Sequence, residues 1–200
     1  MKRTILISLL GLGCAFTRLH AAIDFTPVQG EREVEGVHFK QLLFYYPGGK
    51  VSYTQPMGWN YRGDSKGFSL TPPNLAQASA SIEQLPPPPA APSPEEAIKR
   101  LHDQAVASIP AGSTDVNVIA EEQSPLHIRK QESYGVTLSY KFYGVDYRTN
   151  LLFANLEDVQ LRFRVVARAS DFDKVFSAFR GSLFTMLWEP DPNAKLATAH

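Results

Sequence analysis

The chain has no apolar run long enough to cross a membrane as a helix, which takes about 20 residues. Its most apolar segment, residues 5–13, is short, follows the basic pair Lys2 and Arg3, and precedes small residues near Ala21. This pattern is typical of a secretory signal peptide, although a short buried helix has a similar composition. We therefore expect residues 1–21 to be removed and the mature protein to be soluble and exported, to the periplasm or beyond the cell.

Cysteine is nearly absent, because Cys14 is the only one and lies within the expected signal peptide. Gly13 before it suits a lipoprotein cleavage site, whose cysteine becomes the lipidated first residue, but Gly11 stands where such signals favour leucine. We prefer plain cleavage near Ala21 and keep a lipid anchor at Cys14 as the alternative. Plain cleavage leaves no cysteine, which excludes disulfides, thiolate nucleophiles and cysteine-bound zinc from the mature chain.

An excess of either charge is also missing, since the chain has 20 basic and 20 acidic residues. Removal of residues 1–21 takes away three basic residues and no acidic one, so 17 remain against 20 and the net charge becomes −3. A mildly acidic protein is not a general binder of nucleic acid or anionic membranes. We expect no nucleic-acid partner and a single domain, because the remaining length suits one core.

Motifs that carry catalysis or metal chemistry are lacking as well. Outside the expected signal peptide the histidines are His38, His102, His127 and His200, and none has the spacing of metal ligands. The sequence has no Gly-x-Ser-x-Gly nucleophile elbow, and its one Gly-x-Gly pair lies in the signal segment. We expect no catalytic residue, no metal and no cofactor. The alternative is an exported hydrolase whose site is assembled from distant residues.

What the first half does contain is typical of β-strands. Residues 22–36 are polar without a sustained period and indicate a flexible N-terminal extension. Residues 37–46 are rich in apolar and aromatic side chains and predict a strand, which a Pro-Gly-Gly turn ends before the next strand begins. The proline-rich segment 86–94 predicts a stiff extended spacer, with a docking motif for a proline-reading domain as the alternative.

The second half alternates between helix and strand signals. Ser93, Pro94 and Glu96 predict a helix start, and apolar residues from 98 to 109 form one stripe of that helix. Residues 134–168 predict three antiparallel strands, and the last of them alternates apolar and polar side chains. Ser170-Asp171 predicts the cap of a second helix, whose apolar stripe at 172, 175, 176, 179 and 183 has to lie on the sheet.

These signals together predict an α+β fold: an antiparallel β-sheet with a mid-chain helix and a C-terminal helix packed on it. The domain should span residues 37–189, followed by a disordered tail at 190–200. Within it, the segment SYTQPMGW at 52–59 places a strand aromatic before Pro-x-Gly-Trp, and the final helix opens with an acid and an aromatic residue and runs into FRGSL. With these motifs, the mid-chain helix and the long meander, residues 37–188 resemble the PsbP family.

The resemblance implies a PsbP-like α/β/α sandwich, a fold that a Ran-binding nuclear import factor shares, in an exported bacterial protein. It implies that Pro56 ends a strand, that Gly58 turns the backbone and that Trp59 packs on the edge of the core, with ligand stacking as the alternative. The proline-rich spacer and the polar N-terminal extension depart from the family. PsbP itself is an extrinsic protein of photosystem II, and nothing in this sequence points to a photosystem partner.

Members of this fold bind rather than catalyse, so the resemblance implies a non-enzymatic binding or assembly protein acting on an envelope or membrane-associated complex. Its partner would be an unidentified protein or an anionic envelope component, and we expect the protein to be a monomer. If the strands pair as a meander, four basic residues fall on the face opposite the apolar stripe: Lys141, Arg148, Arg162 and Arg164. Such a cluster suits an anionic partner, and a solvated face balanced by acidic neighbours is the alternative.

The polar segment after Trp59 is the second candidate surface. It carries glycine and polar side chains, which predicts a mobile binding loop. Its candidate contacts are Asn60, Tyr61, Arg62, Asp64 and Lys66. Within it Arg62-Gly63-Asp64 resembles the integrin-recognition tripeptide, although three residues recur by chance in unrelated proteins.

Overall fold

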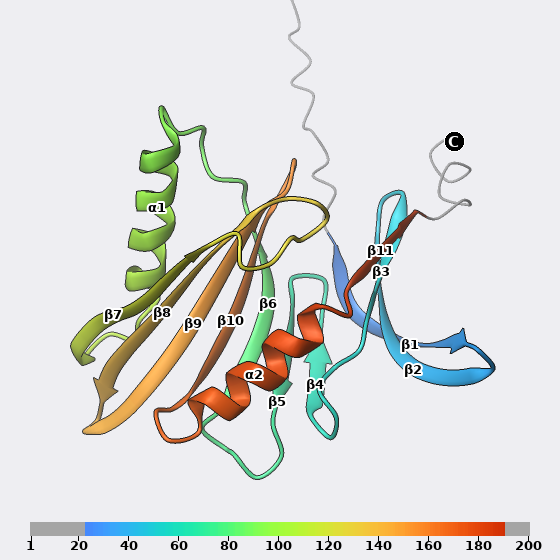
Figure 1. Ribbon diagram of the computed structural model, residues 1–200, viewed down its shortest axis with the longest axis horizontal. Helices are drawn as coiled ribbons and strands as arrows, with labels where there is room; N and C mark the ends of the chain where they lie inside the picture. The colour runs from blue at the N-terminus through green and yellow to red at the C-terminus, as the bar shows by residue number, and fades with distance from the viewer. Residues whose placement is uncertain (1–22, 191–200) are drawn as a thin grey trace, which may run out of the picture.

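Two antiparallel sheets and two helices make up the structure, a computed structural model that describes residues 23–190 (Figure 1). The seven-stranded sheet has the order β4-β5-β6-β10-β9-β8-β7, and the four-stranded sheet has the order β1-β2-β3-β11. The strands are β1 (Asp24–Val34), β2 (Val37–Tyr46), β3 (Gly49–Tyr53), β4 (Asn60–Gly63), β5 (Gly67–Thr71), β6 (Ser79–Leu85), β7 (Thr114–Gln123), β8 (Ser133–Phe142), β9 (Val145–Asn155), β10 (Gln160–Arg168) and β11 (Leu187–Pro190). The helices are α1 (Pro94–Ala107) and α2 (Phe172–Leu183). The predicted α+β fold class is confirmed, and the second sheet is an addition to it.

The two helices pack on opposite faces of the seven-stranded sheet. Helix α1 begins as the sequence predicts, because the Ser93 side-chain oxygen accepts a hydrogen bond from the backbone N–H of Glu96 at 3.2 Å. Its buried Leu101 and Ala105 lie on a small apolar cluster from β8 and β9. Helix α2 begins at Phe172 without a side-chain hydrogen bond from Asp171, so the predicted cap is absent there.

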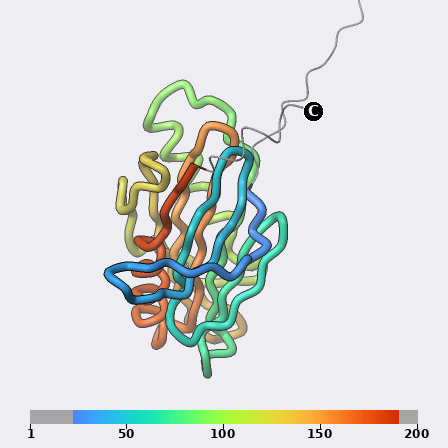
Figure 2. Tube along the Cα trace, turned by 90° about the vertical axis from the view of Figure 1, so that its right-hand side faces the viewer, coloured from blue at the N-terminus to red at the C-terminus, as the bar shows by residue number. Residues whose placement is uncertain are grey.

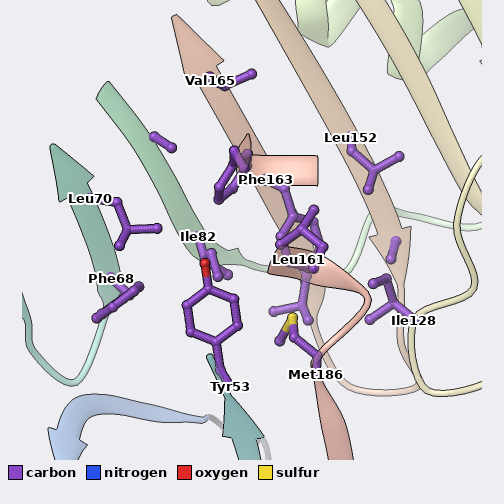
Figure 3. Packing of buried hydrophobic residues seen from close by; sticks show 14 of the residues in the cluster. Tyr53, Phe68, Leu70, Ile82, Ile128, Leu152, Leu161, Phe163, Val165 and Met186 are labelled. Atoms are coloured by element: carbon purple, nitrogen blue, oxygen red, sulfur yellow. The ribbon is translucent and has the colours of Figure 1, made fainter. Parts of the chain in front are cut away.

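The main core lies between the seven-stranded sheet on one side and α2 with the four-stranded sheet on the other. Strand β10 supplies Leu161, Phe163 and Val165, all at most 1% exposed, on the face toward α2 (Figure 3). Tyr53 of β3 and Phe68 of β5 come together in the same core, with ring centroids 5.9 Å apart. The period of two predicted for β10 is therefore confirmed, and it fixes which face of the sheet is buried.

The predicted apolar stripe of helix α2 is not buried in this core along its whole length. Phe172, Val175 and Phe179 are buried, whereas Phe176 is half-buried and stacks on Phe172 with ring centroids 5.4 Å apart. A small residue, Ser182, is also buried, because its hydroxyl is hydrogen-bonded to that of Tyr53 at 2.7 Å. The helix is thus fastened to the four-stranded sheet by a polar contact as well as by phenylalanine packing.

The segment around Trp59 forms a turn, as the resemblance implies. Strand β3 ends at Tyr53, Gly58 has a positive φ of 76°, and the backbone N–H of Trp59 donates to the carbonyl of Pro56 at 3.1 Å. A φ of this sign favours glycine. Trp59 is half-buried against the main core, so the prediction that it packs on the core edge is confirmed.

The prediction of a flexible extension at residues 22–36 is wrong for most of its length. Strand β1 spans Asp24–Val34 and pairs with β2 in an antiparallel hairpin. Figure 2 shows this hairpin, in blue, lying across the other strands. The expected signal peptide and Cys14 lie outside the described residues, and so does the expected tail beyond Pro190. In the described part of the chain, no helix has the length and apolar character needed to cross a membrane.

The first and last strands of the described chain meet in one sheet. Strand β11 pairs with β3, and β3 also pairs with β2, so residues 187–190 complete a sheet that residues 24–53 begin. The guanidinium group of Arg129, from the loop between β7 and β8, lies 5.2 Å from the ring centroid of Tyr46 and 5.6 Å from that of Trp188. These cation–π contacts join three distant segments at the closing strand.

Candidate functional site

The register of the seven-stranded sheet divides the four predicted basic residues between its two faces. Arg148 of β9 is paired with Ala167 of β10, whereas Arg162 and Arg164 alternate with the buried residues of β10. Paired residues share a face and successive residues point to opposite faces. Lys141, which is paired with Asp146, shares the face of Arg148. The prediction that all four lie on one face is therefore wrong.

Lys141 and Arg148 lie on the face that α2 covers, near its edge, and both have acidic neighbours. The Lys141 ammonium is 3.3 Å from the carboxylate of Asp115 and 3.8 Å from that of Asp146. The Arg148 guanidinium is 3.7 Å from the carboxylate of Asp173 on α2. Acidic side chains of the same molecule thus compensate the charges of Lys141 and Arg148. These two residues fit the alternative given above, a solvated face balanced by acidic neighbours.

Arg162 and Arg164 lie on the opposite face, beside the part that α1 covers. Arg162 is paired with Glu83 of β6, and its guanidinium donates to the Glu83 carboxylate at 2.5 Å. Arg164 is paired with Ser81 of β6, which is in turn paired with Ser69 of β5. The two arginines therefore lie beside a row of paired polar side chains that runs across β6 and β5.

The predicted binding loop after Trp59 is a β-hairpin of β4 and β5, so the prediction of an irregular loop is wrong. Arg62 of β4 is paired with Ser69 of β5, and its Nε donates to the Ser69 hydroxyl at 3.2 Å. The Asp64 carboxylate accepts hydrogen bonds from the backbone N–H groups of Lys66 at 2.7 Å and Gly67 at 3.1 Å. Asp64 is thus engaged in closing the turn, which argues against a free recognition tripeptide.

The residues of this hairpin divide between the two faces, as the basic residues do. Asn60 and Arg62 lie on the face of Arg164, because Arg62 is in the same row of paired residues. Tyr61 lies on the other face and packs against Phe68, with ring centroids 5.9 Å apart. Lys66 is exposed in the turn. Arg162 and Arg164 of the predicted basic cluster therefore lie on the same face of the sheet as Asn60 and Arg62 of the predicted loop.

We call this surface the arginine face. It consists of Arg62, Ser69, Ser81, Glu83, Arg162 and Arg164, from β4, β5, β6 and β10. All six side chains are exposed or half-buried, so the face is open to solvent in the described part of the chain. An open groove of about 990 Å³, solvent included, runs over Arg62, Ser69, Ser81 and Glu83 toward the turn with Lys66.

The charges of the arginine face are only partly compensated. Burial alone would raise the pKa of Glu83, but hydrogen bonds from Arg162 and Ser81, with the charges of Arg162 and Arg164, hold this pKa below its usual value. Glu83 is thus ionised at neutral pH and balances Arg162. Among the described residues Arg164 makes no ion pair, and its Nε is buried without a hydrogen-bond partner. One partly desolvated cation therefore remains at the β10 side of the face.

The arginine face contains three residues that the sequence reasoning missed. Ser69, Ser81 and Glu83 are neighbours of the arginines only through the register of β5, β6 and β10. The segments 67–71 and 79–85 do alternate small polar with apolar residues, which is the signal of a strand with one solvated face. That signal could have placed these residues on an open face, but not beside Arg162 and Arg164.

A second polar cluster ties α1 to the edge of the sheet. The Glu121 carboxylate of β7 is 2.7 Å from Nδ1 of His102 and accepts a hydrogen bond from the Tyr134 hydroxyl at 2.7 Å. Burial raises the pKa of Tyr134, and the hydrogen bond and charge of Glu121 raise it further, so this hydroxyl stays protonated. Within residues 23–190, no three acidic, histidine or cysteine side chains are grouped so that they could hold a metal ion.

Comparison with known proteins places the fold among solved structures. LpqN of Mycobacterium tuberculosis, which is involved in cell envelope biogenesis, has a TM-score of 0.50 to this chain at 15% sequence identity, over 84% of this chain and 92% of that one. The fold is PsbP-like. The resemblance inferred from the sequence motifs is therefore confirmed at the level of the fold.

Two further solved structures are similar at lower scores. A protein of unknown function from Pseudomonas aeruginosa has a TM-score of 0.47 at 12% identity, over 82% of this chain and 98% of that one. PsbP of the cyanobacterium Synechocystis sp. PCC 6803 has a TM-score of 0.40 at 11% identity, over 91% of this chain and 98% of that one. No protein-family model and no curated protein sequence matches the chain.

Proposed function

We propose that the protein is a non-enzymatic binding protein of the cell envelope that holds an anionic partner on the arginine face. The observation that supports this most is Arg164, a half-buried cation that makes no ion pair among the described residues. Glu83 attracts this charge but is ion-paired with Arg162, so the compensation of Arg164 is incomplete, and an incompletely compensated charge that has lost part of its hydration is unfavourable in the free protein. An anion of the partner beside Arg164 would supply the missing counter-ion.

The shape of the face favours a macromolecular partner. A surface built on four flat strands offers charges and hydroxyls in rows about 4.8 Å apart, which suits a protein or polymer surface rather than a small molecule in a deep pocket. Arginine donates two parallel hydrogen bonds to carboxylate or phosphate groups, so Arg62 and Arg164 can each hold one acidic group of the partner. The serines between them would add neutral hydrogen bonds.

An envelope location is supported by two independent observations. The N-terminal residues have the pattern of a signal peptide, which predicts export. LpqN, which shares the fold, is involved in cell envelope biogenesis, and we propose a related setting for this chain. The alternative of an exported hydrolase gains little support from the arginine face. The Ser81 hydroxyl donates to the Glu83 carboxylate at 2.9 Å, but Arg162 is ion-paired with this carboxylate and helps to hold its pKa below the usual value, which makes Glu83 a poor base for activating a nucleophile.

The proposal can be tested by capture from an envelope extract, with partners quantified by mass spectrometry. We expect the double variant Arg62→Glu/Arg164→Glu to lose the partner by about tenfold or more, since reversing a charge at an interface replaces attraction with repulsion. The matched control is Lys141→Glu/Arg148→Glu, which reverses two charges on the other face and should retain the partner. Raising the salt concentration should weaken the wild-type complex.

Two outcomes would contradict the proposal. One is a partner that both double variants bind as tightly as the wild type, with the fold of each confirmed by circular dichroism. The other is a complex lost equally in both variants, which would indicate a general effect of net charge rather than a site.

A further inference from the structure

The four-stranded sheet has one face that turns away from the core and is apolar. The register pairs Val28 with Leu43 and Val34 with Val37, and these residues alternate along β2 with the buried Leu42. Leu187 of β11 joins the same face through Ser52 of β3. We call this set the outward stripe: Val28 (43% exposed), Val34 (40%), Val37 (54%), Phe39 (51%), Tyr45 (44%) and Leu187 (37%), with the half-buried Leu43 among them.

The far end of the β1–β2 hairpin is poorly supported by the rest of the molecule. Figure 1 shows this end projecting beyond β3 and β11, away from the rest of the molecule. Its other face, toward the core side, carries Glu31, Glu33, His38 and Lys40, all exposed. A two-stranded ribbon solvated on both faces is only marginally stable in water. Because one of its two faces is apolar, covering the outward stripe would stabilise the hairpin.

We propose that a second copy of the chain covers the outward stripe, in a two-fold symmetric dimer that replaces the monomer expected from the sequence. The stripe has the features of a self-complementary surface. Its apolar residues extend from the hairpin end to β11, with Gln41 and Lys50 among them on the same face. Arg32 is exposed near the hairpin end, and Glu189 lies on this face near the opposite end, 3.2 Å from Lys50. In a two-fold arrangement the stripes cross antiparallel. Arg32 of each copy then lies near Glu189 of the other.

The size of the stripe predicts how strong this dimer is. Seven apolar side chains at these exposures offer on the order of 500 Å² per copy, so the pair would bury about 1,000 Å², near the lower limit for a specific interface. Interfaces of this size are typical of weak, transient complexes, so we expect a dissociation constant of roughly tens of micromolar. An anionic lipid surface is a poorer occupant, because Glu31, Glu33 and Glu35 crowd the hairpin end and would be repelled.

Sedimentation velocity over a range of protein concentrations tests the dimer on the chain as recovered from cells. We expect the wild type to shift from monomer to dimer, Phe39→Glu to remain monomeric, and Arg32→Glu to weaken association by about tenfold. Arg32→Glu/Glu189→Arg should restore part of the affinity, because the charges are exchanged across the interface. The control Phe184→Glu changes a side chain that is 65% exposed on another surface and should dimerise like the wild type.

The proposal is overturned if the wild type stays monomeric at several hundred micromolar. It is also overturned if Phe184→Glu weakens association as much as Phe39→Glu does, or if the exchanged pair fails to recover while its thermal unfolding matches that of the wild type. None of these substitutions touches the arginine face, so the outcome is independent of the function proposed above.

Discussion

The two faces of the seven-stranded sheet differ in what they bury. Toward α2, strand β10 presents Leu161 and Phe163, and the helix and the second sheet cover them fully. Toward α1, the same strand presents Arg162 and Arg164. The apolar side chains of α1 pack on β8 and β9, and α1 reaches β10 through the hydrogen bond from Gln104 to Gln160. The comparison shows that most of the apolar burial is concentrated on one face. The other face carries charged groups in contact with solvent, and for these we propose a binding role.

Among the tests of this comparison, the largest effect is expected for Phe179→Ala, on the buried face. Phe179 of α2 is 3% exposed in the main core, so its truncation should lower the free energy of unfolding by about 3–5 kcal/mol. Urea unfolding measures the change. Phe184→Ala is the matched control, since that ring is 65% exposed and its loss should cost less than about 0.5 kcal/mol. Similar losses of unfolding free energy in the two variants would mean that the packing of α2 is not a main contribution to the stability of the core.

A smaller effect, of opposite sign, is expected on the open face. Arg164→Met removes a half-buried cation without an ion pair and keeps much of its apolar stem, so the free energy of unfolding should stay the same or rise by about 1 kcal/mol. Capture of the anionic partner should fall at the same time. A clear loss of stability in urea would show that Arg164 holds the fold together, which would remove the main support for a binding role.

The smallest effect concerns the acid sensitivity of the arginine face. The folded-state pKa of Glu83 lies below its usual value of about 4.3, so the stability that this carboxylate contributes is present at neutral pH and is lost as the pH falls through that range. Glu83→Gln should therefore be less stable than the wild type at pH 7, and the difference should close toward pH 3. Glu157→Gln, at an exposed turn, is the control and should differ little from the wild type in stability. Thermal unfolding at several pH values measures both.

Features that depend on neighbouring residues in the sequence were predictable. Strand β2 spans the predicted residues 37–46, Ser93 caps α1, and the alternation along β10 identifies its buried face. Each signal is local, because a period or a capping residue acts within a few positions of the chain. The PsbP-like fold could be inferred for the same reason, from the short motifs around Trp59 and α2.

The grouping of the site residues was not predictable, because it depends on register between strands far apart in sequence. A shift of one residue moves a side chain to the other face, and no local signal sets Arg148 of β9 against Arg164 of β10. Strand β1 was missed for a different reason. Most of its residues are exposed on a hairpin solvated on both faces, so its sequence lacks the alternation that marks a half-buried strand.

The pairing of β11 with β3 determines when the molecule can finish folding. The four-stranded sheet needs residues from both ends of the described chain, so its last edge forms only after the whole domain has been synthesised. Contacts between such distant segments are slow to form, because a long loop has to close before any of them is made. The β1–β2 hairpin is synthesised first, whereas β11, the last strand of the same sheet, is synthesised last. During synthesis its apolar residues therefore stay accessible, which gives a chaperone the longest interval for binding this segment.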